Sequence, residues 1–298
     1  MRRRFMLPLA LTLSIGASAV CGACAPKQNI AYTASVYPIY CMLLNLTRGV
    51  PNVSVSCMAS VTAGCAHDYQ MTSDDRRLLA DSNVVVINGA GLEPYLDSIL
   101  PTLSGLVIDS SSRVELIQSK SEHGGVGPNP HIWVSIPRAI SQLETIASGL
   151  IKVDPANADL YSANLSAARE KLRAQFDNMR AALAPYEGAR VATFHPAFDY
   201  FAADFGLIVA ASLTVDPDTP LSARELAGAI NILNEQPARA LFVEPGEIPP
   251  SAQVVQSETG IPIYELSSAI YPMVGVDDAD CYIAAMDANL RTLMEALR

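Results

Sequence analysis

The feature that most constrains the fold of this chain is a regular alternation of strand-like and helix-like segments in each half. Short apolar runs bounded by Gly, Pro, Asn or Asp alternate with segments of helical periodicity. The strand-like runs lie at 30–35, 53–58, 84–87 and 106–108 in the first half and at 190–194, 207–213, 240–243 and 261–266 in the second. The helix-like segments lie at 37–46, 73–80, 93–100 and 137–153 in the first half and at 197–205, 222–236, 251–259 and 281–297 in the second. We also expect a tight strand-to-helix turn at 88–91 and a loop at 110–130. Strands separated by helices pair in parallel, so the pattern predicts an α/β protein with two four-stranded parallel sheets covered by helices.

One long amphipathic segment, 156–183, separates the two halves. Its apolar side chains fall on one stripe, formed by Leu160, Leu165, Leu172, Phe176, Met179 and Leu183. A helix of this length extends for about 40 Å at 1.5 Å per residue, which is enough to brace two lobes rigidly. We therefore expect an N-terminal lobe at 24–153, a linking helix at 154–186 and a C-terminal lobe at 187–298.

Residues 1–23 have the features of a signal peptide. Three arginines precede an apolar segment that is shorter than the roughly 18 residues of a spanning helix, and small residues follow it. The segment ends in Val20-Cys21-Gly22-Ala23-Cys24, which resembles a bacterial lipobox. We expect lipidation of Cys24 and an extracytoplasmic protein anchored to the cell membrane, whereas cleavage after Ala19 would release a soluble periplasmic protein.

The charge balance excludes one class of partner. The chain has 20 Lys and Arg against 30 Asp and Glu, which gives a formal net charge of −10. A nucleic-acid-binding protein needs a basic face that neutralises phosphates, and no Lys/Arg cluster exists outside the signal. The acidity instead favours solubility and slightly raises the local concentration of cations.

Three of the four histidines occupy similar positions in the pattern. His67, His131 and His195 each lie in a short polar loop that follows an apolar run, and only His123 is left over. They are too far apart for a local zinc finger, so a shared metal site must be assembled by the fold, between the lobes and near the carboxyl ends of the strands. The alternative is that the three histidines are structurally unrelated.

Export permits disulfide bonds among the cysteines beyond Cys24. Cys41, Cys57, Cys65 and Cys281 allow three pairings that the sequence does not distinguish, although Cys57 and Cys65 flank one short loop. Cys65 has a second candidate role. It lies two residues before His67, where a thiolate could bind zinc.

Several long motifs, in order along nearly the whole mature chain, resemble one family. They are TAGCAHDYQMTSDD with ADSNVVVINGAGLEPYL, then NPHIWVS, then VATFHPAFDYFAADFGL, and finally ALFVEPGEIPPSAQVVQSETGIPIYEL. They resemble the solute-binding proteins of bacterial zinc and manganese ABC importers, cluster A-I. The resemblance implies His67, His131 and His195 as metal ligands in a cleft between two lobes, and a long rigid helix that joins the lobes.

The chain departs from this family at several positions. Asn129 replaces the usual Asp before Pro-His, and Ser267 aligns with the fourth-ligand carboxylate. Glu265 shares a strand face with Ser267 and is the alternative fourth ligand, with water as the other candidate. Glu244 is interpreted as structural. Where zinc-type members carry a His-rich loop, this chain has only His123, so we expect a solvated linker there.

The function predicted from these features is capture of a divalent metal ion for an ABC transporter permease and its ATPase, by a monomer that is not an enzyme. Three imidazoles without an assured carboxylate favour Zn²⁺ over Mn²⁺, because manganese prefers oxygen ligands. A zinc hydrolase is the alternative from another class, since three ligands and an open position are also a catalytic arrangement. The sequence contains no HExxH motif and no Glu beside a ligand. A surface adhesin is a third candidate that no motif supports.

Overall fold

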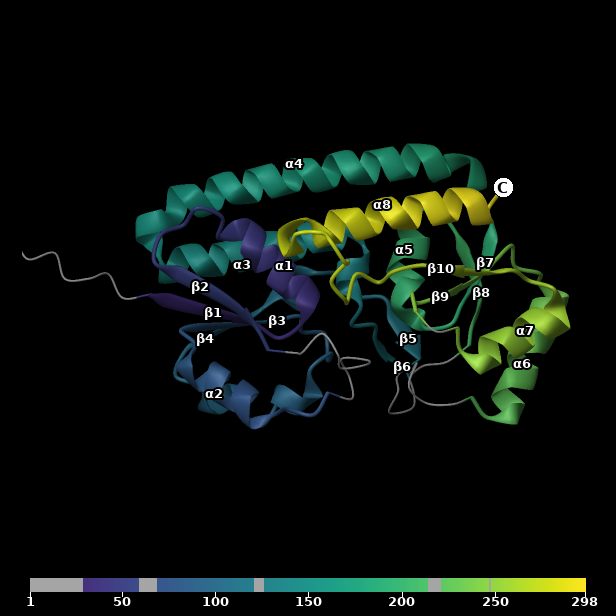
Figure 1. Ribbon diagram of the computed structural model, residues 1–298, viewed down its shortest axis with the longest axis horizontal. Helices are drawn as coiled ribbons and strands as arrows, with labels where there is room; N and C mark the ends of the chain where they lie inside the picture. The colour runs from purple at the N-terminus through teal and green to yellow at the C-terminus, as the bar shows by residue number, and fades with distance from the viewer. Residues whose placement is uncertain (1–28, 59–68, 121–125, 214–220, 247) are drawn as a thin grey trace, which may run out of the picture.

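The computed structural model describes residues 29–58, 69–120, 126–213, 221–246 and 248–298. Two four-stranded parallel sheets lie at opposite ends of the molecule (Figure 1). The first has the order β2 (Val53–Cys57), β1 (Ile30–Ala34), β3 (Val84–Ile87) and β4 (Leu106–Asp109). The second has the order β10 (Ile263–Glu265), β9 (Leu241–Val243), β7 (Arg190–Thr193) and β8 (Ile208–Ser212). The predicted fold class is confirmed.

The helices also follow the predicted order. They are α1 (Tyr37–Leu46), α2 (Ser73–Asp81), α3 (Ile136–Val153), α4 (Ala158–Leu183), α5 (Asp199–Asp204), α6 (Ala223–Glu235), α7 (Pro250–Thr259) and α8 (Asp278–Ala296). Within the described ranges, no helix is long and apolar enough to cross a membrane.

Two segments fold differently from the sequence prediction. The helix expected from Glu93 to Leu100 is replaced by two short 3₁₀ turns, Pro94–Leu96 and Leu100–Thr102, each with a proline in its first positions. Proline lacks the backbone N–H that a continuing helix needs. The region expected to be a loop, 110–130, contains a 3₁₀ turn, Ser110–Arg113, and an antiparallel pair, β5 (Gln118–Lys120) with β6 (Val126–Pro128). His123 lies outside the described residues.

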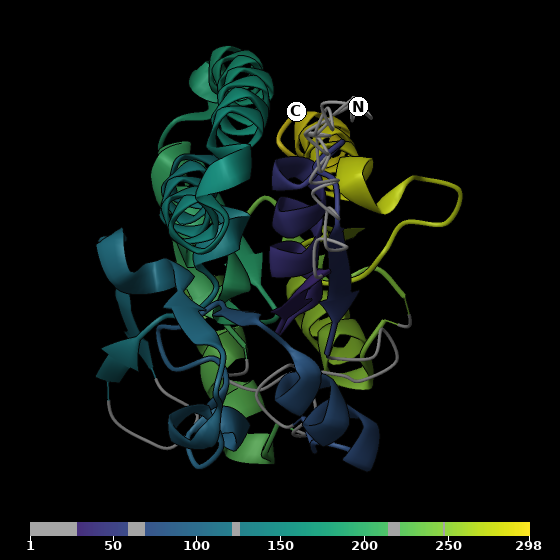
Figure 2. The same ribbon diagram turned by 90° about the vertical axis from the view of Figure 1, so that its left-hand side faces the viewer.

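The long helix α4 runs along both halves of the molecule, as expected, with a second brace beside it (Figure 1). Helix α8 packs against α1 in the first half and against α4, and it also contacts β10 in the second half. Viewed from the end of the first half, α1, α3, α4 and α8 lie together on the same side of the molecule (Figure 2). The sequence pattern predicted only the first of these braces.

The main hydrophobic core is continuous between the halves. One cluster of buried side chains includes Tyr32 and Val86 from the first sheet, Phe201 from α5, and Phe242 from the second sheet. A smaller cluster lies on the other face of the second sheet, and another lies under α2. The two sheets are therefore joined by shared apolar packing as well as by helices.

Candidate metal centre

The fold brings His131 and His195 together from different halves of the chain. His131 precedes the 3₁₀ turn Ile132–Val134 at the entrance to α3, and His195 lies two residues after the end of β7. Their ring centroids lie 4.6 Å apart at an interplanar angle of 87°, and both side chains are buried. Two imidazoles at this separation can share one metal ion.

The third predicted ligand, His67, lies outside the described residues, as do Cys65 and Cys24. The residues on either side of 59–68 lie close to the first sheet and to each other. Met58 follows β2 and donates its N–H to the carbonyl of Ala34 at 2.8 Å, while the Tyr69 hydroxyl lies 3.5 Å from the carbonyl of Met58. Met58 and Tyr69, the residues on either side of 59–68, therefore lie near the carboxyl edge of the first sheet, where open α/β sheets bind their ligands.

Asn129 orients the imidazole of His131. Its Oδ1 lies 2.9 Å from Nδ1 of His131 and 3.0 Å from the backbone nitrogen of the same residue. An amide oxygen only accepts hydrogen bonds, so Nδ1 carries the proton and Nε2 presents its lone pair. This is the tautomer in which a neutral histidine binds a metal through Nε2.

His195 has the opposite arrangement. Its Nδ1 accepts the backbone N–H of Ala197 at 3.0 Å, and this bond caps the 3₁₀ turn Pro196–Phe198. Because Nδ1 uses its lone pair in this contact, the neutral ring carries its proton on Nε2.

Trp133 fixes the other side of the His131 segment. Its indole ring lies 5.4 Å from the His131 ring, centroid to centroid, and Nε1 donates to the carbonyl of Ser268 at 2.7 Å. The Tyr282 hydroxyl of α8 donates to the carbonyl of Trp133 at 2.6 Å. His131 thus lies between anchors that belong to the second half of the chain.

Glu244 positions Ser268, whose carbonyl accepts the hydrogen bond from Trp133. Both of its carboxylate oxygens accept the N–H of Ser268, at 3.2 and 3.1 Å. Burial raises the pKa of the Glu244 carboxyl to about 7, and the hydrogen bonds from Ser268 oppose this rise. These contacts agree with the structural interpretation of this residue.

The two candidates for the fourth ligand have other contacts. Glu265 is exposed and its Oε1 lies 3.3 Å from the N–H of Gly246. The Ser267 hydroxyl accepts the N–H of Ala269, and its main chain pairs with the side chain of Asn289. Among the residues that the structure describes, no three His, Cys, Asp or Glu side chains converge on one point.

A buried polar network supports the His131 loop from the first half. Asn88 donates to the carbonyl of Pro130 at 2.9 Å and accepts from Gln142 at 3.0 Å. Glu93 accepts the backbone N–H groups of Asn88 and Gly89 and the hydroxyl of Ser35. Burial raises the pKa of the Glu93 carboxyl to about 7, and these hydrogen bonds oppose the rise.

The sequence pattern did not predict this network, although it predicted the turn that contains Asn88 and Gly89. The turn was predicted to be a tight strand-to-helix connection, and Gly89 adopts φ +80° there. A Cβ at Gly89 would lie 2.0 Å from Oδ1 of Asp109. The sequence feature that could have indicated the network is Glu93, an acidic residue just after the turn that accepts the N–H groups which the turn exposes.

Two of the cysteines are buried together and remain thiols. Cys41 of α1 and Cys281 of α8 pack in one small cluster with Tyr37. Burial raises the pKa of the Cys41 thiol far above its usual value, which disfavours the reactive thiolate. Cys65, which with Cys57 flanks one short loop, lies outside the described residues.

Comparison with known proteins places this geometry in context. The family described as "Zinc-uptake complex component A periplasmic" matches residues 33–296. A putative metal-binding protein of Treponema pallidum is 26% identical over 273 residues, which cover 85% of this chain and 84% of that protein. The zinc-binding protein AdcA of Streptococcus pyogenes is 23% identical over 90% of this chain, which spans only 56% of the length of AdcA.

Solved structures share the fold. The solute-binding protein FpvC of Pseudomonas aeruginosa in complex with Mn²⁺ matches with a TM-score of 0.81 and 28% identity, covering 91% of this chain and 99% of that one. A crystal structure of ZnuA matches with a TM-score of 0.77 and 24% identity, covering 91% and 100% of the two chains. The match over 33–296, together with the paired histidines and the two-sheet fold, establishes that the chain belongs to the periplasmic zinc-uptake component A family, the metal-binding solute-binding proteins of ABC importers.

Proposed function

We propose that this member of the family captures Zn²⁺ outside the cytoplasm and delivers it to the permease and ATPase of an ABC importer. The observation that carries the proposal is the buried pair of imidazoles, His131 and His195, at the junction of the two halves. His67 is the third ligand in this proposal, and the support for it is that the flanking residues Met58 and Tyr69 lie near the carboxyl edge of the first sheet. The fourth position is filled by water or by Glu265 after it leaves Gly246.

The donor set favours zinc within a family of mixed preference. AdcA is named as zinc-binding, YfeA of Yersinia pestis as iron-binding, and FpvC has been solved with Ni²⁺ and Mn²⁺. Three neutral nitrogens suit zinc, whereas manganese prefers carboxylate oxygens. Ser267, where a carboxylate is expected, supplies no anionic oxygen.

The remaining parts of the proposal concern anchoring and organisation. Cys24 carries a lipid that holds a monomeric protein at the membrane surface, and the lobes span 24–153 and 187–298 with 154–186 between them. The protein binds and releases its metal without chemical turnover, so the zinc-loaded form will not hydrolyse ester or peptide substrates. AdcA of Streptococcus pneumoniae, which is 24% identical over 90% of this chain, is itself named a lipoprotein.

The decisive experiment is elemental analysis of the protein as purified, followed by competition between Zn²⁺ and Mn²⁺ for the metal-free protein. We expect zinc to bind more tightly by several orders of magnitude, in accordance with the Irving–Williams order. Manganese binding as tight as zinc would overturn the zinc assignment. It would leave the assignment to metal import intact.

Two variants identify the fourth ligand in the same assay. Ser267→Asp adds an anionic oxygen and should strengthen manganese binding proportionately more than zinc binding. Glu265→Ala should weaken zinc binding strongly if this carboxylate is the fourth ligand. An unchanged affinity would assign the position to water or Cys65.

A further inference from the structure

The carboxamide of Asn129 uses every hydrogen-bonding position that it has. Its Nδ2 donates to the carbonyl of Pro196 at 2.9 Å and to Oδ2 of Asp199 at 3.2 Å. Its Oδ1 faces the backbone N–H and the Nδ1 of His131 at 3.0 and 2.9 Å. The residue is fully buried. A primary amide offers two donor hydrogens and two acceptor lone pairs, so this side chain is completely satisfied.

The surroundings also fix which way the amide points. The carbonyl of Pro196 can only accept a hydrogen bond, and the backbone N–H of His131 can only donate one. A reversed amide would place donor against donor and acceptor against acceptor in a site without solvent, where unpaired polar groups are costly. The oxygen of Asn129 is therefore fixed against His131 and its NH₂ group is fixed against the segment after His195.

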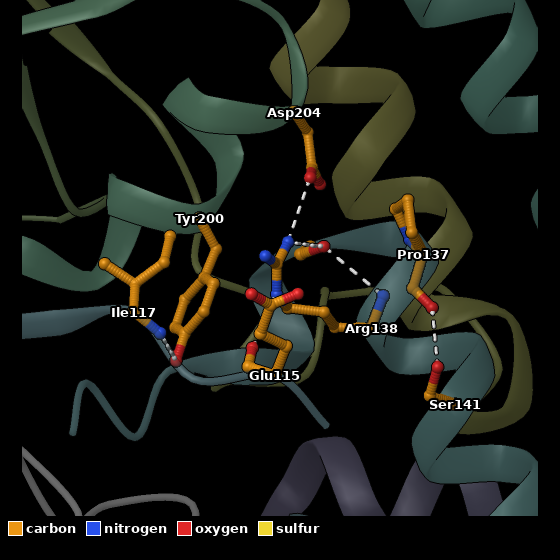
Figure 3. A network of polar contacts seen from close by, with 8 residues as sticks. Glu115, Ile117, Pro137, Arg138, Ser141, Tyr200 and Asp204 are labelled. Carbon is orange, nitrogen blue, oxygen red and sulfur yellow. Dashed lines mark hydrogen bonds and ion pairs between the residues drawn. The ribbon is translucent and has the colours of Figure 1, made fainter. Parts of the chain in front are cut away.

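The main chain of Asn129 is tied to the same helix. The Tyr200 hydroxyl of α5 donates to the carbonyl of Asn129 at 2.7 Å and accepts the N–H of Ile117 at 3.1 Å. Figure 3 shows Ile117 at the Tyr200 hydroxyl. Side chain and main chain of Asn129 thus both bind the segment 196–200.

Arg138 adds a charged contact between α3 and α5. Its guanidinium carbon lies 4.7 Å from the centroid of the Tyr200 ring, and Nη1 pairs with Oδ1 of Asp204 at 3.1 Å (Figure 3). Nε of the same guanidinium donates to the carbonyl of Glu115. These contacts hold α5, which follows His195, against the start of α3, which follows His131.

We propose that Asn129 is the positioning residue of the metal site, with two separable roles. Its oxygen holds His131 in the Nδ1–H tautomer, and its NH₂ group holds the loop of His195 at a fixed distance from the His131 ring. The proposal rests on the proposed function only in that the two histidines bind the metal. The tautomer of His131 and the spacing of the loops are properties of the metal-free protein.

Two substitutions separate these roles. Asn129→Asp keeps an acceptor toward His131 but places a carboxylate against Pro196 and Asp199, so the tautomer is retained while the tie to the His195 loop is lost. Asn129→Ala removes both. The matched control is Asn164→Ala, since the Nδ2 of Asn164 also donates two hydrogen bonds, to the carbonyls of Leu46 and Arg48, and they join α4 to the region of α1.

The experiment records long-range ¹H–¹⁵N spectra of the histidine rings in the metal-free protein, and Kd for zinc alone by competition with a chelator. In wild type we expect His131 as the pure Nδ1–H form. In Asn129→Ala, its two ring nitrogens should shift toward the values of mixed tautomers and zinc should bind about 10- to 100-fold more weakly, the usual effect of losing an outer partner of a ligand. Asn129→Asp should weaken zinc binding with an unchanged tautomer, and Asn164→Ala should change neither.

The double variant Asn129→Asp with Asp199→Asn restores one amide donor between positions 129 and 199, and we expect it to recover part of the lost zinc affinity. A wild-type tautomer and wild-type affinity in Asn129→Ala overturn the proposal. Equal losses in Asn129→Ala and Asn164→Ala, with no change in the His131 spectrum, also overturn it, because general destabilisation then explains them. A shifted tautomer in a protein whose wild type binds no zinc supports the positioning role and refutes the proposed function instead.

Discussion

His131 and His195 lie beside each other, yet their neighbours prepare the two rings in opposite ways. Asn129 accepts a hydrogen bond from the protonated Nδ1 of His131, which leaves Nε2 of that ring with a lone pair. Ala197 donates its backbone N–H to Nδ1 of His195, which leaves the proton of that ring on Nε2. One histidine is ready to bind a metal through Nε2, and the other serves as a helix cap.

The difference shows that only part of the site is organised before the metal arrives. If His195 binds the metal through Nε2, its proton must move to Nδ1, where it would face the N–H of Ala197. If His195 binds through Nδ1, the metal displaces that N–H directly. In either case His195 gives up one hydrogen bond, which contributes about 1 kcal/mol. His131 keeps its hydrogen bond to Asn129 when it binds a metal through Nε2, so removal of the two ligands should raise the Kd for zinc by different amounts.

The largest effect is expected from removing the ligands themselves. His131→Ala should raise the Kd for zinc by about a hundredfold or more, since each ligand contributes roughly 3 kcal/mol of a typical total near 12 kcal/mol. His195→Ala should raise the Kd for zinc by a factor about fivefold smaller, because metal binding to this variant no longer breaks the hydrogen bond from Ala197. His67→Ala should weaken binding by at least about tenfold.

Competition with a fluorescent chelator measures these constants, and His123→Ala is the control that should leave Kd unchanged. Equal losses for His131→Ala and His195→Ala would remove the distinction between the two rings. A wild-type affinity in any one of the three variants would remove that residue from the site.

Acidification should weaken zinc binding by about a thousandfold between pH 7.5 and 5.5, because each of the three imidazoles contributes a factor of about ten. Free imidazole titrates near pH 6.5, and each ligand must lose its proton to bind, so protons compete with the metal below that pH. Titrations at both pH values in buffers of equal ionic strength check this. The dependence should be shallower in His131→Ala, which has one imidazole fewer, and an affinity that is flat over this range would contradict a three-histidine site.

Glu93 should make the support of the His131 loop sensitive to pH. Its pKa is about 7 in the folded protein against an ordinary value of 4.5, so its stabilising contribution is complete below about pH 4.5 and is lost as pH rises through 7. The free energy of unfolding of the metal-free protein should fall by about 2 kcal/mol more between pH 5.5 and 8 in wild type than in Glu93→Gln. Urea denaturation of both proteins at the two pH values measures the difference, and parallel changes would show that Glu93 does not titrate in this range.

The smallest effect is expected far from the histidines. Lys171 of α4 pairs with Asp280 of α8 at 2.6 Å, and both side chains are about half exposed. Exposed ion pairs contribute little, so Lys171→Ala should change the free energy of unfolding by less than about 1 kcal/mol and leave Kd for zinc unchanged. A loss of zinc affinity in this variant would show that the braces, rather than the local contacts, position the two rings.

The sequence predicted the sheets and helices well because buried parallel strands are short apolar runs, and α4 carries a visible apolar stripe. It also selected His131 and His195 as partners, because each follows a regular element in a polar loop. It did not predict the roles of Asn129 and Trp133. Their partners, Asp199 and Ser268, are 70 and 135 positions away, and no local pattern encodes such a pairing.

The same limit explains what was missed elsewhere. The sequence pattern of α8 is that of an ordinary C-terminal helix. Only its packing against both α1 and α4 makes it a second brace. The two 3₁₀ turns after β3 were expected as one helix that ends at Pro101, whereas Pro94 and Pro101 lie in the first positions of two separate turns.

The continuous core that joins the two sheets has a consequence for folding. A chain cut within α4 would leave Phe201 and Phe242 on one piece and Tyr32 and Val86 on the other, so that neither piece could bury the apolar surface that it contributes to this core. The molecule should therefore melt in one cooperative transition in spite of its two sheets. A metal bound between the halves stabilises the whole of this unit by RT ln(1 + [metal]/Kd), so the difference between the melting curves with and without metal would report the affinity of the site.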